Sequence, residues 1–140
     1  MSTYRGMYVK AIIKKEYRSD LEGVINKELA WEDCANKVFR DLANQTRAEM
    51  LPFCLESINT VWDNKYAQLP VTLDMQYGIL EFANTIKNGG DIIMYFIFNT
   101  LATIAETAHI EVLDEQWNTS KKYEVKSGCV ESSKGNLYYI

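Results

Sequence analysis

The stretch NGGDIIMYFIFNTLATIAETAHIEV, residues 88–112, limits the possible folds of this chain more than any other feature. Its uninterrupted apolar run covers residues 92–98, and even with its polar interruptions tolerated the run ends at Ala105. That length is short of the ~20 residues that a membrane-spanning helix needs. We therefore expect no membrane span, and the choice is between a buried strand and a buried helix.

The spacing of the apolar residues favours the helix. Asp91 follows a turn at residues 88–90 and can cap a helix by accepting from the N–H groups of its first turn. Apolar side chains then recur every three or four positions over four turns, at Met94, Ile97, Leu101, Ile104, Ala105 and Ala108. These features predict one largely buried helix over residues 91–107.

Alternating patterns flank this helix on both sides. In GILEFANTIK, residues 78–87, three apolar residues share one face, and in HIEVLDEQW, residues 109–117, Ile110 and Val112 point inward while His109 and Glu111 point outward. A helical crossover of this length suits two parallel strands of one sheet, with a right-handed connection. A further strand is expected at residues 122–126, then a turn at Ser127 and Gly128, and GNLYYI reads as a last short strand or an ordered tail.

The N-terminal half contains the same kinds of element. Met7, Val9, Ala11 and Ile13 share one face of a strand, and Ser19 to Glu22 reads as a capping box that starts a helix. A second helical pattern runs from Trp31 to Leu42. Strands are expected around residues 53–61 and 71–75, with a loop over residues 63–70.

Together these elements predict a single α+β domain over residues 1–140: a two-layer sandwich of a mixed sheet with helices on one face, in a ferredoxin-like arrangement with a C-terminal βαβ unit. A chain of 140 residues is long enough for one core. The order of HIEVLDEQW followed by KKYEV resembles small uncharacterised α+β proteins of bacteriophages and mobile elements. The resemblance covers the last third of the chain and carries no functional residue with it.

The N-terminal sequence and the cysteines favour an intracellular protein. The N-terminus lacks the apolar core and cleavage site of a signal peptide, so a cytoplasmic location is expected. Cys34, Cys54 and Cys129 lack disulfide or zinc-ligand spacing and are expected to be free thiols.

The charges are unevenly distributed along the chain. Residues 1–18 carry five basic and one acidic side chain, net +4, and residues 19–140 carry ten basic and eighteen acidic side chains, net −8. An acidic body has little drive to bind phosphates, so nucleic acid is an unlikely partner.

No motif for catalysis, a cofactor or a metal stands out in the sequence. His109 lies between Glu106 and Glu111, and a general base or a metal ligand could be built from such neighbours. A histidine hydrogen-bonded to a carboxylate at a strand edge is the simpler interpretation. The acidic residues near 111–115 lack the spacing of a calcium loop. Residues 88–91 have neither the spacing nor the lysine of a phosphate loop. No catalytic, cofactor-binding or metal-binding residue is predicted.

Two classes of function stay open. The first is a non-enzymatic protein-binding module, an inhibitor or modulator of the anti-CRISPR or similar anti-defence type, which can also pair with itself as a homodimer through its terminal strand. Its predicted interface consists of Trp117, Tyr123, Tyr138, Tyr139, Glu111, Asp114 and Glu115. The second is a small-molecule-binding domain or minor enzyme with a pocket between sheet and helices, using His109 and Glu111.

Overall fold

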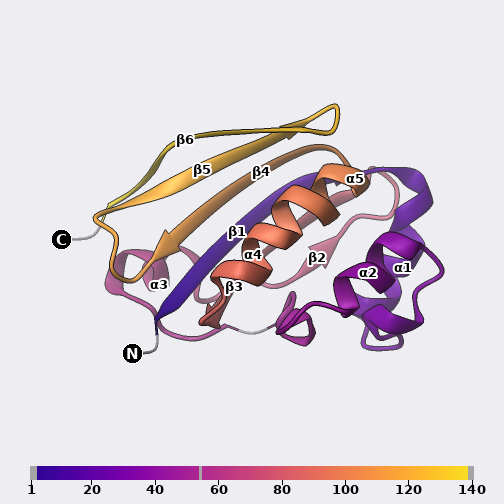
Figure 1. The fold of residues 1–140 in the computed structure, drawn as a ribbon, viewed down its shortest axis with the longest axis horizontal. Helices are drawn as coiled ribbons and strands as arrows, with labels where there is room; N and C mark the ends of the chain where they lie inside the picture. The colour runs from indigo at the N-terminus through magenta and orange to yellow at the C-terminus, as the bar shows by residue number, and fades with distance from the viewer. Residues whose placement is uncertain (1–2, 54, 139–140) are drawn as a thin grey trace.

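The computed structural model describes residues 3–53 and 55–138, which form a six-stranded sheet with helices packed on it (Figure 1). The strand order is β2-β3-β1-β4-β5-β6, and every neighbouring pair is antiparallel. The α+β class is therefore confirmed, whereas the prediction of a mixed sheet is wrong. The strands are β1 (Tyr4–Ile13), β2 (Thr72–Leu73), β3 (Ile79–Lys87), β4 (Ala105–Asp114), β5 (Thr119–Lys126) and β6 (Cys129–Tyr138).

The helical segments divide between the two faces of the sheet. The α-helices are α1 (Arg18–Ile25), α2 (Lys37–Ala43), α3 (Thr60–Tyr66), α4 (Gly90–Tyr95) and α5 (Ala102–Ile104); a π-helix, η4 (Phe96–Leu101), joins the last two. Short 3-10 turns are η1 (Lys15–Tyr17), η2 (Trp31–Asp33) and η3 (Ala48–Met50). We call the face covered by α1, α2 and α4 to α5 the helical face, and the other the α3 face.

The apolar stretch that limits the fold is helical, as its spacing predicts. A continuous helix runs from Gly90 to Ile104 through α4, η4 and α5, and it buries Ile93 and Ile97 completely. It ends before Thr107, because Ala105 is extended and already begins β4. Asp91 lies in the first turn and is not the cap, since Gly89 occupies that position. No helix in the described residues is long and apolar enough to cross a membrane.

The strands on either side of this helix run in the same direction but are not neighbours. Both β3 and β4 pair antiparallel with β1, which lies between them: Val9 is opposite Phe82 on one side and Ile110 on the other. These three buried side chains point to the helical face. The predicted crossover is thus present, with the first strand of the chain inserted between its two strands.

Local details of the N-terminal half differ from the sequence prediction. Helix α1 begins at Arg18 without a side-chain cap, so the capping box at Ser19 is not formed. The single helix predicted from Trp31 is interrupted, because Cys34 is extended between η2 and α2. Of the strand predicted at residues 71–75, only β2 forms.

The strand predicted at residues 53–61 is also wrong, because helix α3 begins at Thr60 and crosses the predicted loop. Asn59 caps this helix: its Oδ1 accepts from the Trp62 backbone N–H at 2.9 Å. The Trp62 ring lies directly on Gly6 of β1, where an added Cβ would be 2.4 Å from the ring. Helices therefore lie on both faces of the sheet and not on one. Helix α3 covers one end of the α3 face (Figure 1). The small core there consists of Trp62, Tyr66, Ala83, Leu113 and Leu137.

Candidate functional site

The β5–β6 hairpin and the residues just before it carry a group of basic and aromatic side chains at the edge of the sheet. Figure 1 shows that β5 and β6 extend beyond the part of the sheet that α4 to α5 cover. On the helical face, Lys121 of β5 is directly opposite Lys134 of β6. The Lys121 Nζ lies 5.6 Å from the ring centroid of Tyr123, and the Lys134 Nζ lies 5.3 Å from that of Tyr138. We call Trp117, Lys121, Tyr123, Lys134 and Tyr138 the hairpin surface.

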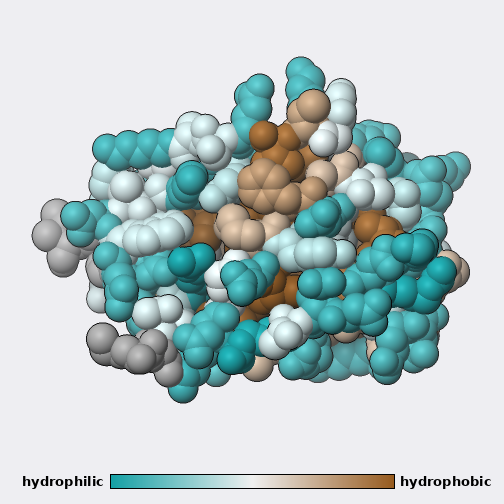
Figure 2. Space-filling view, in the orientation of Figure 1, coloured by the Kyte–Doolittle hydropathy of each residue, from teal (hydrophilic) through white to brown (hydrophobic). Residues whose placement is uncertain are grey.

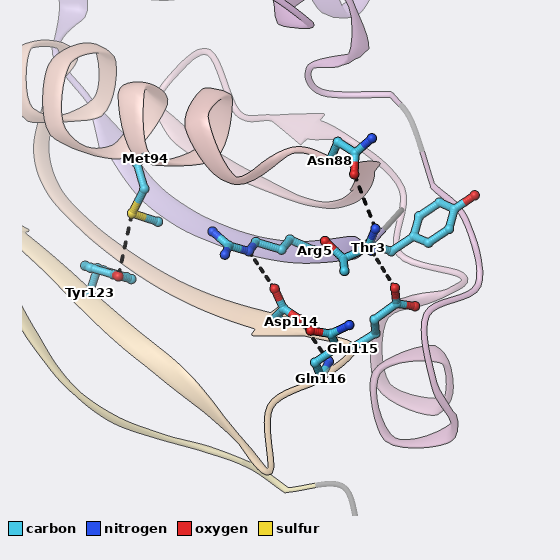
Figure 3. A network of polar contacts seen from close by, with 9 residues as sticks. Thr3, Arg5, Asn88, Met94, Asp114, Glu115, Gln116 and Tyr123 are labelled. Atoms are coloured by element: carbon cyan, nitrogen blue, oxygen red, sulfur yellow. Dashed lines mark hydrogen bonds and ion pairs between the residues drawn. The ribbon is translucent and has the colours of Figure 1, made fainter. Parts of the chain in front are cut away.

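The predicted interface aromatics differ in how far they reach solvent. Tyr138 is 52% exposed, whereas Tyr123 is buried and its hydroxyl donates to the Met94 Sδ at 3.7 Å (Figure 3). Trp117 is partly buried, with the Arg5 guanidinium carbon 5.3 Å from its ring centroid. Tyr139 lies outside the described residues. Tyr138 is therefore the predicted aromatic residue best placed to contact a partner.

The predicted acidic residues hold the fold together. The Arg5 Nε donates to Asp114 at 2.7 Å, and the backbone N–H of Tyr4 donates to Glu115 at 2.9 Å (Figure 3). Asp114 is 4% exposed and Glu111 is 2% exposed. Asp114 and Glu115 fix the start of β1 to the end of β4, so the predicted acidic residues do not form a free acidic surface.

An apolar patch adjoins the hairpin surface on the helical face. Figure 2 shows hydrophobic surface gathered over the helix and the neighbouring strands, surrounded by hydrophilic side chains. Phe98 of η4 is 48% exposed and packs edge-on against Tyr123 at 5.9 Å between ring centroids. Partly buried Val130 and Met94 also pack against this part of the core. The hairpin surface is thus continuous with exposed apolar area.

On the α3 face, a cleft of about 380 Å³ brings together the two residues of the predicted pocket, His109 and Glu111. The cleft lies between the strands and helix α3, on the face of the sheet opposite the larger helical layer. The ring of Tyr8 stacks on Tyr66 at 4.7 Å, and its hydroxyl donates to Glu81 at 2.5 Å. The cleft is lined by Tyr8, Lys65, Tyr66, Leu69, Glu81, His109, Glu111 and Asn136.

Both tyrosines of this cleft are held in the protonated form. Burial raises the pKa of Tyr8 well above its usual value, and the adjacent Glu81 carboxylate raises it further. Burial likewise raises the pKa of Tyr66, with a further contribution from Glu111. The two hydroxyls therefore remain hydrogen-bond donors at neutral pH and do not supply a general base.

Glu111 has a structural task in this cleft. Its Oε2 accepts from the Ser120 hydroxyl and from the Asn136 backbone N–H, each at 2.6 Å. Gly135 lets β6 approach, because a Cβ there would lie 2.6 Å from the same oxygen. His109 uses its Nδ1 in a 2.7 Å contact with Glu124. The polar atoms of the predicted pocket are thus largely engaged in holding strands together.

Residues 3–53 and 55–138 contain two cysteines, Cys34 and Cys129. No group of three or more His, Cys, Asp or Glu side chains in that part of the chain could hold a metal ion. Cys34 is buried, and burial raises the pKa of its thiol to about 11. Cys129 is free and exposed, and Cys54 lies outside the described residues.

A cavity of about 570 Å³ lies between α1, η2 and η3, and its lining contains none of the site residues predicted from the sequence. Its buried floor includes Trp31, whose indole N–H donates to the Leu51 carbonyl at 3.0 Å, and Phe53 and Lys27 stand at its mouth. It can accept an apolar group, but no unpaired buried polar atom of the described residues belongs to its lining.

Sequence reasoning missed the two lysines of the hairpin surface, although the signal was present. A two-residue turn at Ser127 and Gly128 sets the register of the hairpin, and counting outward from it places Lys121 opposite Lys134. Tyr8 could have been assigned to the α3 face, because it alternates with Met7 and Val9.

Comparison of the chain with protein-family models, with curated proteins and with solved structures finds no match.

Proposed function

We propose that this protein is a non-enzymatic protein-binding module that receives an extended segment of another chain along β6. The observation that supports the proposal is the position of β6, a ten-residue strand at the end of the sheet with β5 as its one neighbour among the described strands. Alternate backbone N–H and C=O groups of an edge strand point away from the sheet and can pair with another strand. The role as an inhibitor or modulator from a phage or mobile element stays a prediction.

The side chains around β6 suit this mode of binding. In strand addition, main-chain hydrogen bonds supply affinity and neighbouring side chains supply specificity. Tyr138 and Phe98, both about half exposed, lie on the same side of the hairpin as Lys134. Exposed aromatic residues contribute strongly to protein interfaces. The opposite sheet edge offers less, because β2 has two residues.

We also propose that β1 to β4 form a ferredoxin-like unit, to which β5 and β6 are added as a hairpin. The strand order β2-β3-β1-β4 and the helical crossover from β3 to β4 support this arrangement. The added hairpin then serves binding, because among the described residues β6 contributes to the core beneath the helices one partly buried side chain, Val130.

Site-specific photo-crosslinking in cells that express the protein natively tests the binding mode. A photoreactive residue at Ser132 of β6 should crosslink to another chain, and the attached peptide should be identified by mass spectrometry. The matched control is the same residue at Glu22, which is exposed on α1. Equal crosslinking at both positions, or none at Ser132, contradicts strand addition.

A small-molecule site in the α3-face cleft is the second candidate function. The observation in its favour is the convergence of Tyr8, Tyr66, Glu81 and His109 on one cleft. If this site carries the function, His109→Ala abolishes a small-molecule activity while Ser132 variants leave it unchanged.

A further inference from the structure

We infer that the segment received by β6 is acidic and that Lys121 and Lys134 bind its carboxylates. This inference rests on the proposed strand addition and adds the chemical class of the partner. It starts from the direct opposition of two lysines on the helical face of the hairpin. Like charges on directly opposite strand positions, with Cβ atoms about 5 Å apart, destabilise a sheet. The hairpin therefore keeps an arrangement that costs stability.

No carboxylate of the described residues forms an ion pair with either lysine. The paired positions on the same face of the hairpin carry no acidic side chain: Thr119, Tyr123 and Val125 on β5, and Val130, Ser132 and Tyr138 on β6. Both ammonium groups lie over tyrosine rings, which attract cations and restrict where the side chains can go.

The other face of the same hairpin has the opposite arrangement. There Glu124 is directly opposite Glu131, which is again a like-charge pair. In that case the fold supplies a cation and a further polar partner: the Lys122 Nζ lies 3.7 Å from the Glu124 carboxylate, and the His109 Nδ1 lies 2.7 Å from it. One like-charge pair is thus compensated within the chain and the other is not. The uncompensated pair is the one beside the exposed aromatic residues.

Other occupants fit the hairpin surface less well. A second copy of this chain, paired through β6 about a two-fold axis perpendicular to the sheet, would place Lys134 of both copies on the same face and increase the repulsion. A nucleic acid needs a row of cations, whereas the chain carries −4 overall and this surface holds two lysines. An extended segment with Asp or Glu at alternate positions directs its carboxylates to one face, toward the two ammonium groups.

The test measures binding of synthetic peptides by fluorescence anisotropy. The first peptide alternates Glu and Val and is called the Glu peptide. The second, the Gln peptide, has Gln in place of Glu. The third keeps Glu but is N-methylated at alternate residues, which prevents its backbone from pairing with a strand. The double variant Lys121→Ser, Lys134→Ser should bind the Glu peptide at least about 10-fold more weakly than the unaltered protein. The control Lys122→Ser, Lys126→Ser removes the same charge from the other face and should stay within about 2-fold.

The three peptides distinguish failure of the acidic-partner inference from failure of strand addition. If the Glu and Gln peptides bind equally and N-methylation abolishes both, strand addition holds and the acidic partner is refuted. If the N-methylated peptide binds as well as the parent, strand addition is refuted. Four other outcomes each overturn the acidic-partner inference. They are an equal loss of binding in both double variants, a preference for a single-stranded oligonucleotide, no binding to the Glu peptide, and dimerisation through β6 in solution. Circular dichroism checks that all variants are folded.

Discussion

The two faces of the sheet differ in how completely they are covered. On the helical face, α1, α2 and the helix from Gly90 to Ile104 cover a continuous core of large apolar side chains. On the α3 face, one seven-residue helix covers a cluster of five buried residues, and ionisable side chains occupy much of the rest. The larger core therefore lies on the helical face, whereas the parts of the sheet that helices do not cover leave charged and aromatic side chains exposed.

The largest expected effect comes from a charge placed in the helical-face core. Ile97→Asp puts a carboxylate at a position that is 0% exposed, and it should lower the free energy of unfolding by at least ~4 kcal/mol. The control is the next residue, Phe98→Asp, at a position that is 48% exposed. Urea denaturation should show a clearly smaller loss for the control, about 1 kcal/mol, because the half-exposed Phe98 ring loses its edge-on contact with Tyr123. Similar losses for both variants would mean that the core does not lie where the structure places it.

On the α3 face, the expected effect is smaller and depends on one close contact. Trp62→Ala should cost about 3 kcal/mol, because it removes the largest side chain of a small cluster that can partly collapse. Gly6→Ala should also destabilise the protein, since its Cβ would lie 2.4 Å from the Trp62 ring. In the Trp62→Ala background the same Gly6→Ala change should cost little. Additive losses in this double-mutant cycle would contradict the contact.

The contrast between the faces also explains which elements could be predicted from sequence. Helix 90–104 and strands β1, β3 and β4 carry long periodic patterns toward one large core, and these patterns identified them. Helix α3 contributes little to that core, so its apolar residues are few, and residues 53–61 resemble a strand. Its start is nevertheless encoded locally, by Asn59 as the cap and by Asp63, which accepts from the Ile58 backbone N–H at 3.1 Å.

The candidate site was less predictable because pairing across strands decides it. Alternation placed Glu111 outward, and that face is the α3 face, yet Glu111 is buried there because β6 and α3 close over it. Asp114 and Glu115 look like a free acidic patch in the sequence, but their partners Arg5 and Tyr4 are more than a hundred positions away. The sequence alone contains no local sign of such long-range contacts.

Glu111 allows the closure of the α3 face to be tested. Glu111→Leu leaves the Ser120 hydroxyl and the Asn136 N–H without their acceptor, which should cost about 1–3 kcal/mol of unfolding free energy. Glu131→Leu makes the same change of charge at an exposed position of β6 and should stay within about 0.5 kcal/mol. Faster hydrogen exchange in β6 of the Glu111 variant alone would locate the effect. Equal stability of the two variants would contradict the anchoring role.

The smallest expected effect is a dependence of stability on alkaline pH that originates in the α3-face cleft. The pKa values of Tyr8 and Tyr66 are raised in the folded protein, mainly by burial, whereas in the unfolded chain both groups titrate near pH ~10. Above that pH the unfolded state loses protons that the folded state keeps. Their contribution to stability is therefore complete below pH ~10 and is lost as the pH rises beyond it.

Melting curves recorded across this alkaline range, together with tyrosinate absorbance, measure the effect. Tyr8→Phe and Tyr66→Phe should each flatten the decline in melting temperature, because a phenylalanine ring has no proton to lose in the unfolded state. Tyr77→Phe changes a ring that is 62% exposed and serves as the matched control; it should keep the decline of the unaltered protein. If the Tyr77 variant flattens the decline in melting temperature as much as the cleft variants do, the raised pKa values of Tyr8 and Tyr66 are not the cause of the decline. The α3-face cleft would then lack the two protonated tyrosine hydroxyls that support it as the second candidate site.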